Sequence, residues 1–202
     1  MSIVKLNNRS VKDVTAFGSI TSLGSLTHIA TQTASSSTTI SFTSGIDSTY
    51  KEYIFYFVNI HPSGTNRFQF NGSSDSGSNY NVTKTTTIFV AHHAEGGSDA
   101  ALVYQSGDDL AQSTAFQDLM AYGNQDADND HSLNGTLHLF NPSSTTFVKH
   151  FISRSQGNID TDYSVDSHVA GYFNTTSAIN AVQFKMTSGN IDSGQILLFG
   201  IN

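Results

Sequence analysis

The chain has 202 residues, no Cys, no Trp and a formal net charge of −7 at pH 7. The absence of Cys excludes disulfide scaffolds, thiolate metal sites and thiol nucleophiles, and the acidic balance argues against nucleic acid as a partner. No apolar run approaches the ~20 residues that span a bilayer, and the first residues lack the apolar stretch of a secretory signal, so we expect no membrane segment.

The charged residues point to a fold class. They make up only 12% of the chain, and Glu occurs only at Glu52 and Glu95. Helices normally fill their exposed faces with Glu and Lys, whereas the Ser, Thr, Gly and Asn that abound here suit turns and strand faces. The composition therefore predicts an all-β protein.

The first 24 residues show no sustained apolar period. They carry Lys5, Arg9 and Lys12, which are three of the nine basic residues. A basic segment before an acidic domain predicts an N-terminal arm that anchors the protein on an acidic partner. The alternative is an ordinary ragged terminus or a first edge strand. Residues 25–202 are expected to form one domain.

Strand patterns begin at Leu26 with an alternation through residue 33. The strongest pattern covers residues 50–61, where Tyr53, Phe55 and Phe57 lie on one face and a second apolar set lies on the other. A strand that is apolar on both faces lies in the middle of a sandwich or against a neighbouring subunit. We therefore take Tyr53, Phe55 and Phe57 as a candidate subunit interface.

The rest of the chain predicts a series of short strands. They are expected in residues 38–43, 67–71, 80–84, 87–91, 101–105, 132–140, 146–153, 169–173, 179–187 and 195–201. Only a short Pro-containing turn separates residues 132–140 from 146–153, which predicts a hairpin. Phe116, Leu119 and Met120 are spaced for one or two helical turns within residues 113–122. Together these elements predict an antiparallel β-sandwich, with a jelly roll as first choice and an immunoglobulin-like fold as second.

An acidic cluster is the sharpest local motif. Asp126, Asp128 and Asp130 place carboxylates at every second position, where they can converge on a hard cation such as Ca²⁺. The EF-hand pattern fails, because His131 stands at its glycine position and Leu137 at its final Glu position. The alternative is a solvated acidic loop.

The sequence gives little support for catalysis. It contains no HExxH, no GxSxG and no Walker A loop, so we expect a protein that is not an enzyme and has no cofactor. Exposed aromatic side chains can instead stack on sugar rings. Five tyrosines in or near predicted loops are candidates for contact with a glycan: Tyr80, Tyr104, Tyr122, Tyr163 and Tyr172.

Several stretches resemble virion-associated structural proteins of marine tailed phages, the cyanophages and pelagiphages. They are residues 47–63 (DSTYKEYIFYFVNIHPS), 77–86 (GSNYNVTKTT), 136–153 (TLHLFNPSSTTFVKHFIS) and 170–201 (AGYFNTTSAINAVQFKMTSGNIDSGQILLFGI). The similarity covers about residues 25–202 and contains no catalytic motif. It implies a jelly-roll-like protein of the virion surface, on the head or on tail fibres.

Three functions follow as hypotheses. The first is a capsid decoration or head-fibre subunit that contacts the major capsid protein or tail proteins and forms a homo-oligomer, with a trimer favoured because it fits threefold lattice positions. The second is a tail-fibre or receptor-binding domain that recognises host surface glycans during attachment. The third is a free carbohydrate-binding module.

Overall fold

The computed structural model describes residues 26–201. Within this range the chain forms twelve β-strands and no helix, so nothing helical there could cross a membrane. The strands are β1 (Leu26–Thr33), β2 (Ile40–Phe42), β3 (Glu52–Pro62), β4 (Phe68–Ser73), β5 (Lys84–Ala94), β6 (Ala100–Tyr104), β7 (Gln117–Asp118), β8 (Leu133–Phe140), β9 (Lys149–Ile159), β10 (Tyr163–Phe173), β11 (Ala181–Met186) and β12 (Ile191–Ile201).

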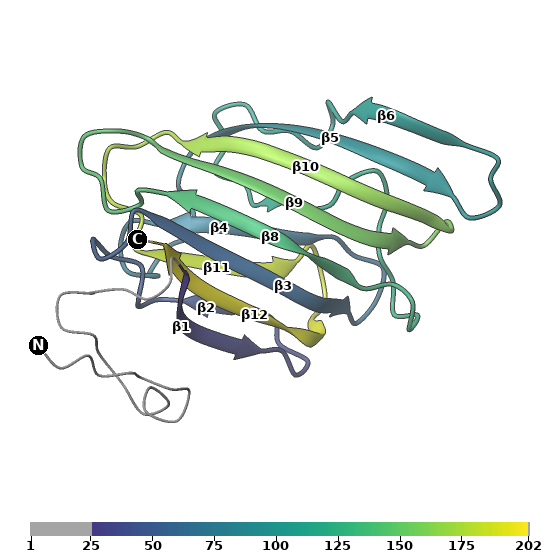
Figure 1. The fold of residues 1–202 in the computed structure, drawn as a ribbon, viewed down its shortest axis with the longest axis horizontal. Coiled ribbons are helices and arrows are strands. Elements are labelled where there is room, and N and C mark those ends of the chain that lie inside the picture. The colour runs from purple at the N-terminus through teal and green to yellow at the C-terminus, as the bar shows by residue number, and fades with distance from the viewer. Residues whose placement is uncertain (1–25, 202) are drawn as a thin grey trace, which may run out of the picture.

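The strands form two antiparallel sheets that pack face to face (Figure 1). The larger sheet has eight strands in the order β1-β12-β3-β8-β9-β10-β5-β6, and the smaller has four in the order β2-β11-β4-β7. The predicted all-β antiparallel sandwich is therefore confirmed. The predicted hairpin is confirmed too, because β8 and β9 pair with Leu137 opposite Ser153 and Leu139 opposite Phe151.

Part of the sandwich has the strand order of a jelly roll. Setting β5, β6, β9 and β10 aside leaves the larger sheet as β1-β12-β3-β8 against β2-β11-β4-β7. In this set the first strand pairs with the last, the second with the next to last, and so on inward to β4 and β7. Such nested pairing across two sheets is the double Greek key of the jelly roll. We call these eight strands the jelly-roll part.

The four remaining strands form two inserted hairpins that lengthen the larger sheet. The hairpin β5-β6 lies between β4 and β7 in the chain, and the hairpin β9-β10 lies between β8 and β11. They join through β10 and β5, which pair along their whole length. We call these four strands the extension; in Figure 1 its last strand, β6, lies at the opposite edge of the sheet from β1.

Residues 105–132 cover the inner face of the extension. The Leu110 carbonyl accepts a hydrogen bond from the Thr86 amide at 2.8 Å, and the Ala121 amide donates to the Ser167 hydroxyl at 3.1 Å. The expected helical turns at residues 113–122 are wrong. This segment is extended, because the Leu119 amide donates to the Phe68 carbonyl at 2.8 Å and so continues the pairing of β7 with β4.

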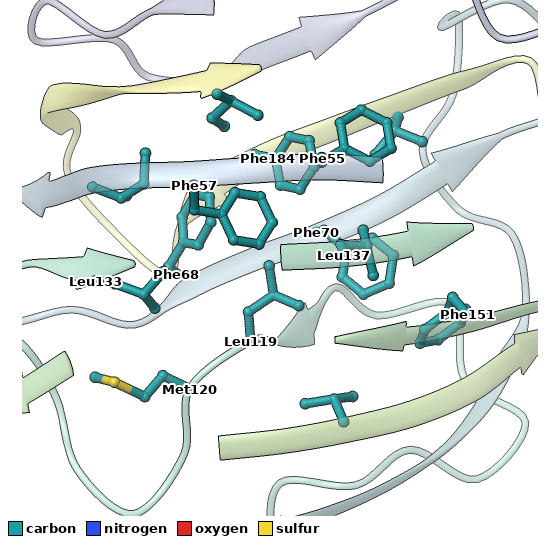
Figure 2. Close-up of a cluster of buried hydrophobic side chains, with 14 of the residues drawn as sticks. Phe55, Phe57, Phe68, Phe70, Leu119, Met120, Leu133, Leu137, Phe151 and Phe184 are labelled. Carbon is teal, nitrogen blue, oxygen red and sulfur yellow. The ribbon is translucent and has the colours of Figure 1, made fainter. Parts of the chain in front are cut away.

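Aromatic side chains fill the space between the two sheets of the jelly-roll part (Figure 2). The Phe184 ring packs edge to face with Phe55 at 5.2 Å and with Phe57 at 5.3 Å between centroids. Tyr53 and Phe55 are fully buried, and Phe57 is 2% exposed. This placement corrects the expectation that these three side chains form a subunit interface, because the second sheet of the same chain already covers them.

Candidate functional site

The outer face of the eight-stranded sheet is not covered by the second sheet, which packs on the inner face. Residues along its strands alternate between buried and accessible, as in β9, where Phe151 and Ser153 point inward while Ile152 and Arg154 point outward. We call this accessible side the open face; Figure 1 looks onto the sheet that carries it. It presents large apolar side chains to solvent: Val58, Phe89, Leu102, Tyr104 and Ile152.

A shallow apolar groove of about 370 Å³ lies on the open face. Its centre is Ala170, which pairs with Ile152 of β9 on one side and with Thr87 of β5 on the other. The small Ala170 side chain leaves space between these neighbours. Tyr172 and His150 form one wall, with their rings 5.9 Å apart and tilted by 49°. Phe140, from the end of β8, also lines the groove.

Two charged side chains of the open face form an ion pair. Arg154 donates two hydrogen bonds to Asp166, at 3.0 and 2.8 Å, and this contact lowers the pKa of the Asp166 carboxyl. The His168 ring stacks on Phe89 with centroids 4.8 Å apart and planes 7° apart. The groove is one apolar, aromatic part of the open face, and such a surface suits a ligand with a flat apolar side.

The two histidines of the β8-β9 hairpin do not face each other. His138 lies opposite Ile152, and its Nδ1 is 2.6 Å from a carboxylate oxygen of Glu52 on β3. His150 instead lies opposite Tyr172 on β10. The strand register therefore separates the two histidines: His138 lies beside Glu52, and His150 lies beside Tyr172.

The predicted acidic cation site has a different composition in the structure. Asp126, Asp128 and His131 bring one ligand atom each to within 4.8 Å of one another. Asp130 does not belong to this group; its carboxylate is 3.8 Å from Nε2 of His131. The chain turns after Asp128 so that His131 is buried while Asp130 stays exposed.

The electrostatics of this loop favour a proton on the histidine. Burial by itself lowers the pKa of His131, but the hydrogen bond and charge of Asp126 outweigh burial and raise the pKa above its ordinary value. The Nδ1 of His131 is 2.5 Å from Asp126 Oδ1. The same Asp126 oxygen accepts the Asp128 amide at 2.9 Å, and this bond is the main reason that the pKa of Asp126 is lowered. A metal ion would have to displace the proton of His131 before that nitrogen could bind it.

A polar cleft of about 420 Å³ lies beside the acidic loop. His61 connects the two, because its Nε2 is 3.0 Å from the Asp128 carbonyl oxygen and its Nδ1 is 3.9 Å from Asp192. The cleft offers amide, hydroxyl and carboxylate groups from the ends of β3 and β12 and from the loop before β8: Asn59, Asn129, Ser132, Asp192 and Ser193.

The tyrosines predicted to contact a glycan are dispersed. Tyr172 lines the groove, and Tyr104 lies elsewhere on the open face. Tyr122 and Tyr163 instead pack against the buried His92, with the Tyr122 ring stacked at 3.8 Å. Sequence reasoning missed Phe140, His150 and Ile152, because only the register of β8, β9 and β10 places them beside Tyr172. Every second residue of the predicted hairpin points outward, and Phe140, His150 and Ile152 are among these residues. That alternation is the signal that could have found them.

Lys5, Arg9 and Lys12 lie outside the described residues, so the anchoring arm stays a prediction. No family model matches the chain, and no match was found among curated proteins or among solved structures.

Proposed function

We propose that the chain is a structural protein of a tailed-phage virion, displayed on the particle surface as a capsid decoration or head-fibre subunit. The observation that carries the proposal is the strand order β1-β12-β3-β8 against β2-β11-β4-β7, which is the jelly-roll architecture that the resemblance implies. The stretches within residues 25–202 whose sequence resembles marine phage virion proteins suggest the same role. In this role the protein needs no cofactor and works by assembly.

The proposed anchor is the N-terminal arm. The whole chain has nine Lys and Arg against sixteen Asp and Glu, and the arm holds three of the nine cations, Lys5, Arg9 and Lys12. A basic arm on an acidic domain can bind an acidic surface of the major capsid protein or of a tail protein while the domain projects. We expect the bound form to be a homo-oligomer, and a trimer would suit threefold positions of the lattice.

Localisation on purified particles tests the role. The measurements are immunogold electron microscopy with an antibody against residues 25–202, and the copy number relative to the major capsid protein. Hundreds of copies on the head are the expected result. About a dozen copies on the tail would transfer the proposal to a receptor-binding fibre, and absence from the particle would overturn it.

The arm is tested separately by adding purified protein to particles that lack it. Deleting residues 1–24 is expected to abolish binding, and the triple change Lys5→Gln, Arg9→Gln and Lys12→Gln is expected to weaken it. Lys51→Gln, which changes an exposed lysine of the domain, is the control. Normal binding of the truncated protein would show that the arm is not the anchor.

Recognition of a glycan is the second candidate function, and the groove favours it. A pyranose ring has an apolar C–H face that can stack on Tyr172 and Phe140, and Thr85 and Thr87 also line the groove. This activity would suit a tail-fibre domain or a free carbohydrate-binding module. On a glycan array, Tyr172→Ala should abolish any specific signal, whereas Tyr104→Ala, outside the groove, should leave it unchanged. Equal loss in both variants would contradict the assignment to the groove.

A further inference from the structure

Strand β6 ends the eight-stranded sheet as an unprotected edge. Within residues 26–201 it pairs only with β5, so the other side of its backbone has no partner strand. Its five residues, Ala100–Tyr104, include no charged side chain and no Pro. Leu102 is 72% exposed and Tyr104 is 52% exposed. Edge strands of soluble proteins usually carry Lys, Pro or a bulge that prevents further pairing, and β6 has none of these.

The register shows which backbone groups of β6 are free for a partner. The Gln105 amide donates to the Ile88 carbonyl at 3.0 Å, and the Ala94 amide donates to the Asp99 carbonyl at 2.8 Å. Residues that bond to a neighbouring antiparallel strand alternate along the chain, so Ala101 and Val103 also bond toward β5. The amides and carbonyls of the alternate residues therefore point away from the sheet: Ala100, Leu102 and Tyr104.

We propose that β6 pairs in antiparallel fashion with β6 of a second copy of this chain, about a two-fold axis at Leu102. This axis places Leu102 opposite Leu102 of the second copy and Ala100 opposite its Tyr104. Each of these pairs can exchange both of its N–H···O bonds, because all three residues present their backbone groups outward. The two large sheets become one continuous sheet.

Side chains and charges fit a second copy. The large Tyr104 lies opposite the small Ala100, and the two Leu102 side chains meet on the open face, where such cross-strand contacts stabilise a sheet. At the next position outward, Asp99 lies opposite Gln105, so no like charges face each other across the pair. A two-fold contact brings the same surface of both copies together, so that surface must match itself. A single uncharged strand meets this requirement, and no second matching surface is needed.

The contact is compatible with the other surfaces. The groove centred on Ala170 lies between β9, β10 and β5 and stays open, and β1 lies at the opposite edge of the sheet. The inference is therefore independent of the proposed virion role. It concerns a two-fold contact, which differs from the threefold one that a lattice position would favour.

A single cysteine tests the pairing, because the chain has none of its own. Residues opposite each other in a bonded antiparallel pair have Cα atoms about 5.5 Å apart, which is within the range for a disulfide. Leu102→Cys in the full chain is therefore expected to oxidise to a covalent dimer on a non-reducing gel. The matched control is Ala91→Cys, which is exposed on the same face one strand inward, where the two copies of the residue would be about 14 Å apart. Cross-linking that is no faster for Leu102→Cys than for Ala91→Cys would overturn the proposal.

Mass measurement of the full chain gives the second test. Native mass spectrometry and light scattering of the unmodified protein are expected to show a dimer that dissociates on dilution. Leu102→Pro removes one outward amide but none of the amides that bond to β5, so it is expected to raise the dissociation constant at least tenfold. Leu102→Thr keeps the amide and should retain the dimer. A monomer at all concentrations, a trimer, or a dimer that Leu102→Pro leaves unchanged would contradict the pairing; if that variant fails to fold, the cysteine pair decides.

Discussion

The jelly-roll part and the extension belong to one continuous sheet, yet their inner faces are packed with different side chains. Between the two sheets of the jelly-roll part the contacts are aromatic: Phe42, Phe55, Phe57, Phe68 and Phe184. Under the extension, the inward positions of β9 and β10 include small residues instead: Ser153, Ser155, Gly157, Ser167 and Gly171. The inner face of the extension therefore combines large buried rings, such as Phe151 and Phe173 against Phe70, with small residues where the covering segment approaches closely.

The close approach is visible at Gly157. A Cβ atom at this position would lie 2.9 Å from the Ser132 carbonyl oxygen and 3.1 Å from the Met120 sulfur. Both neighbours belong to residues 105–132, so this covering segment lies directly against β9. Small inward residues are thus a requirement of the extension, because it is covered by an irregular segment and only partly by a second sheet.

The junction between the two parts also buries cations. Lys84, at the start of β5, is fully buried and donates hydrogen bonds to Asn71 Oδ1 at 2.9 Å and to the Ala115 carbonyl. Lys149, at the start of β9, donates to the carbonyls of Phe147 and Thr175 at 2.9 and 3.1 Å. Among residues 26–201 no carboxylate forms an ion pair with either amine. Burial lowers the pKa of both lysines, and that of Lys84 falls to about 7.

The largest effect is expected in the aromatic part. Phe184→Ala removes a fully buried ring that contacts five other phenylalanine rings, and it should lower the free energy of unfolding by about 3–5 kcal/mol. Urea denaturation measures this loss. The matched control is Phe147→Ala, because Phe147 is 69% exposed, and its change should stay within about 0.5 kcal/mol. A loss below about 2 kcal/mol for Phe184→Ala would mean that the aromatic cluster does not hold the sandwich together.

The next effect concerns the buried lysine at the junction. The pKa of Lys84 is about 7 in the fold against 10.5 for an unperturbed lysine, so between these values the unfolded chain binds the additional proton. The free energy of unfolding therefore rises with pH through that window, and the titration of Lys84 contributes up to about 2 kcal/mol of this rise between pH 7 and 9. The measurement is urea denaturation at several pH values.

Lys84→Met should remove this increase, and Lys51→Met, at an exposed lysine, should retain it. Asn71 Oδ1 keeps a donor in Lys84→Met, because the Gly72 amide also bonds to it at 2.8 Å. The same pH dependence in Lys84→Met and in the unmodified protein would mean that Lys84 is charged in the fold.

The same contrast explains what could be predicted from the sequence. Strands of the jelly-roll part have apolar residues at alternate positions, as in residues 132–140, or on both faces, as in residues 50–61, and their existence and the sandwich class follow from these patterns. The second half of β9 and the first half of β10 were not expected. Their inward positions include Ser155, Gly157 and Ser167, which are also typical of loops, and only the covering segment gives these residues a buried role.

The candidate sites were predictable only where the residues are close in the chain. Asp126, Asp128 and Asp130 were expected to converge, but the structure groups Asp126 and Asp128 with His131 instead, because the turn that buries His131 leaves Asp130 exposed. The groove needs three strands in register before Tyr172 and His150 become neighbours. A single sequence does not contain the order of strands within a sheet.

The smallest effects test whether small polar residues under the extension are tolerated or required. The Ser167 hydroxyl accepts the buried Ala121 amide at 3.1 Å, so Ser167→Ala leaves that amide unpaired and should cost about 1 kcal/mol. The Ser155 hydroxyl is buried without a partner in the described part of the chain, so Ser155→Ala should change stability by less than about 0.5 kcal/mol or increase it. Both changes remove one oxygen from an inward position of the same sheet, and urea denaturation compares them directly. Equal losses would mean that the extension depends on the size and shape of these side chains and not on their hydrogen bonds.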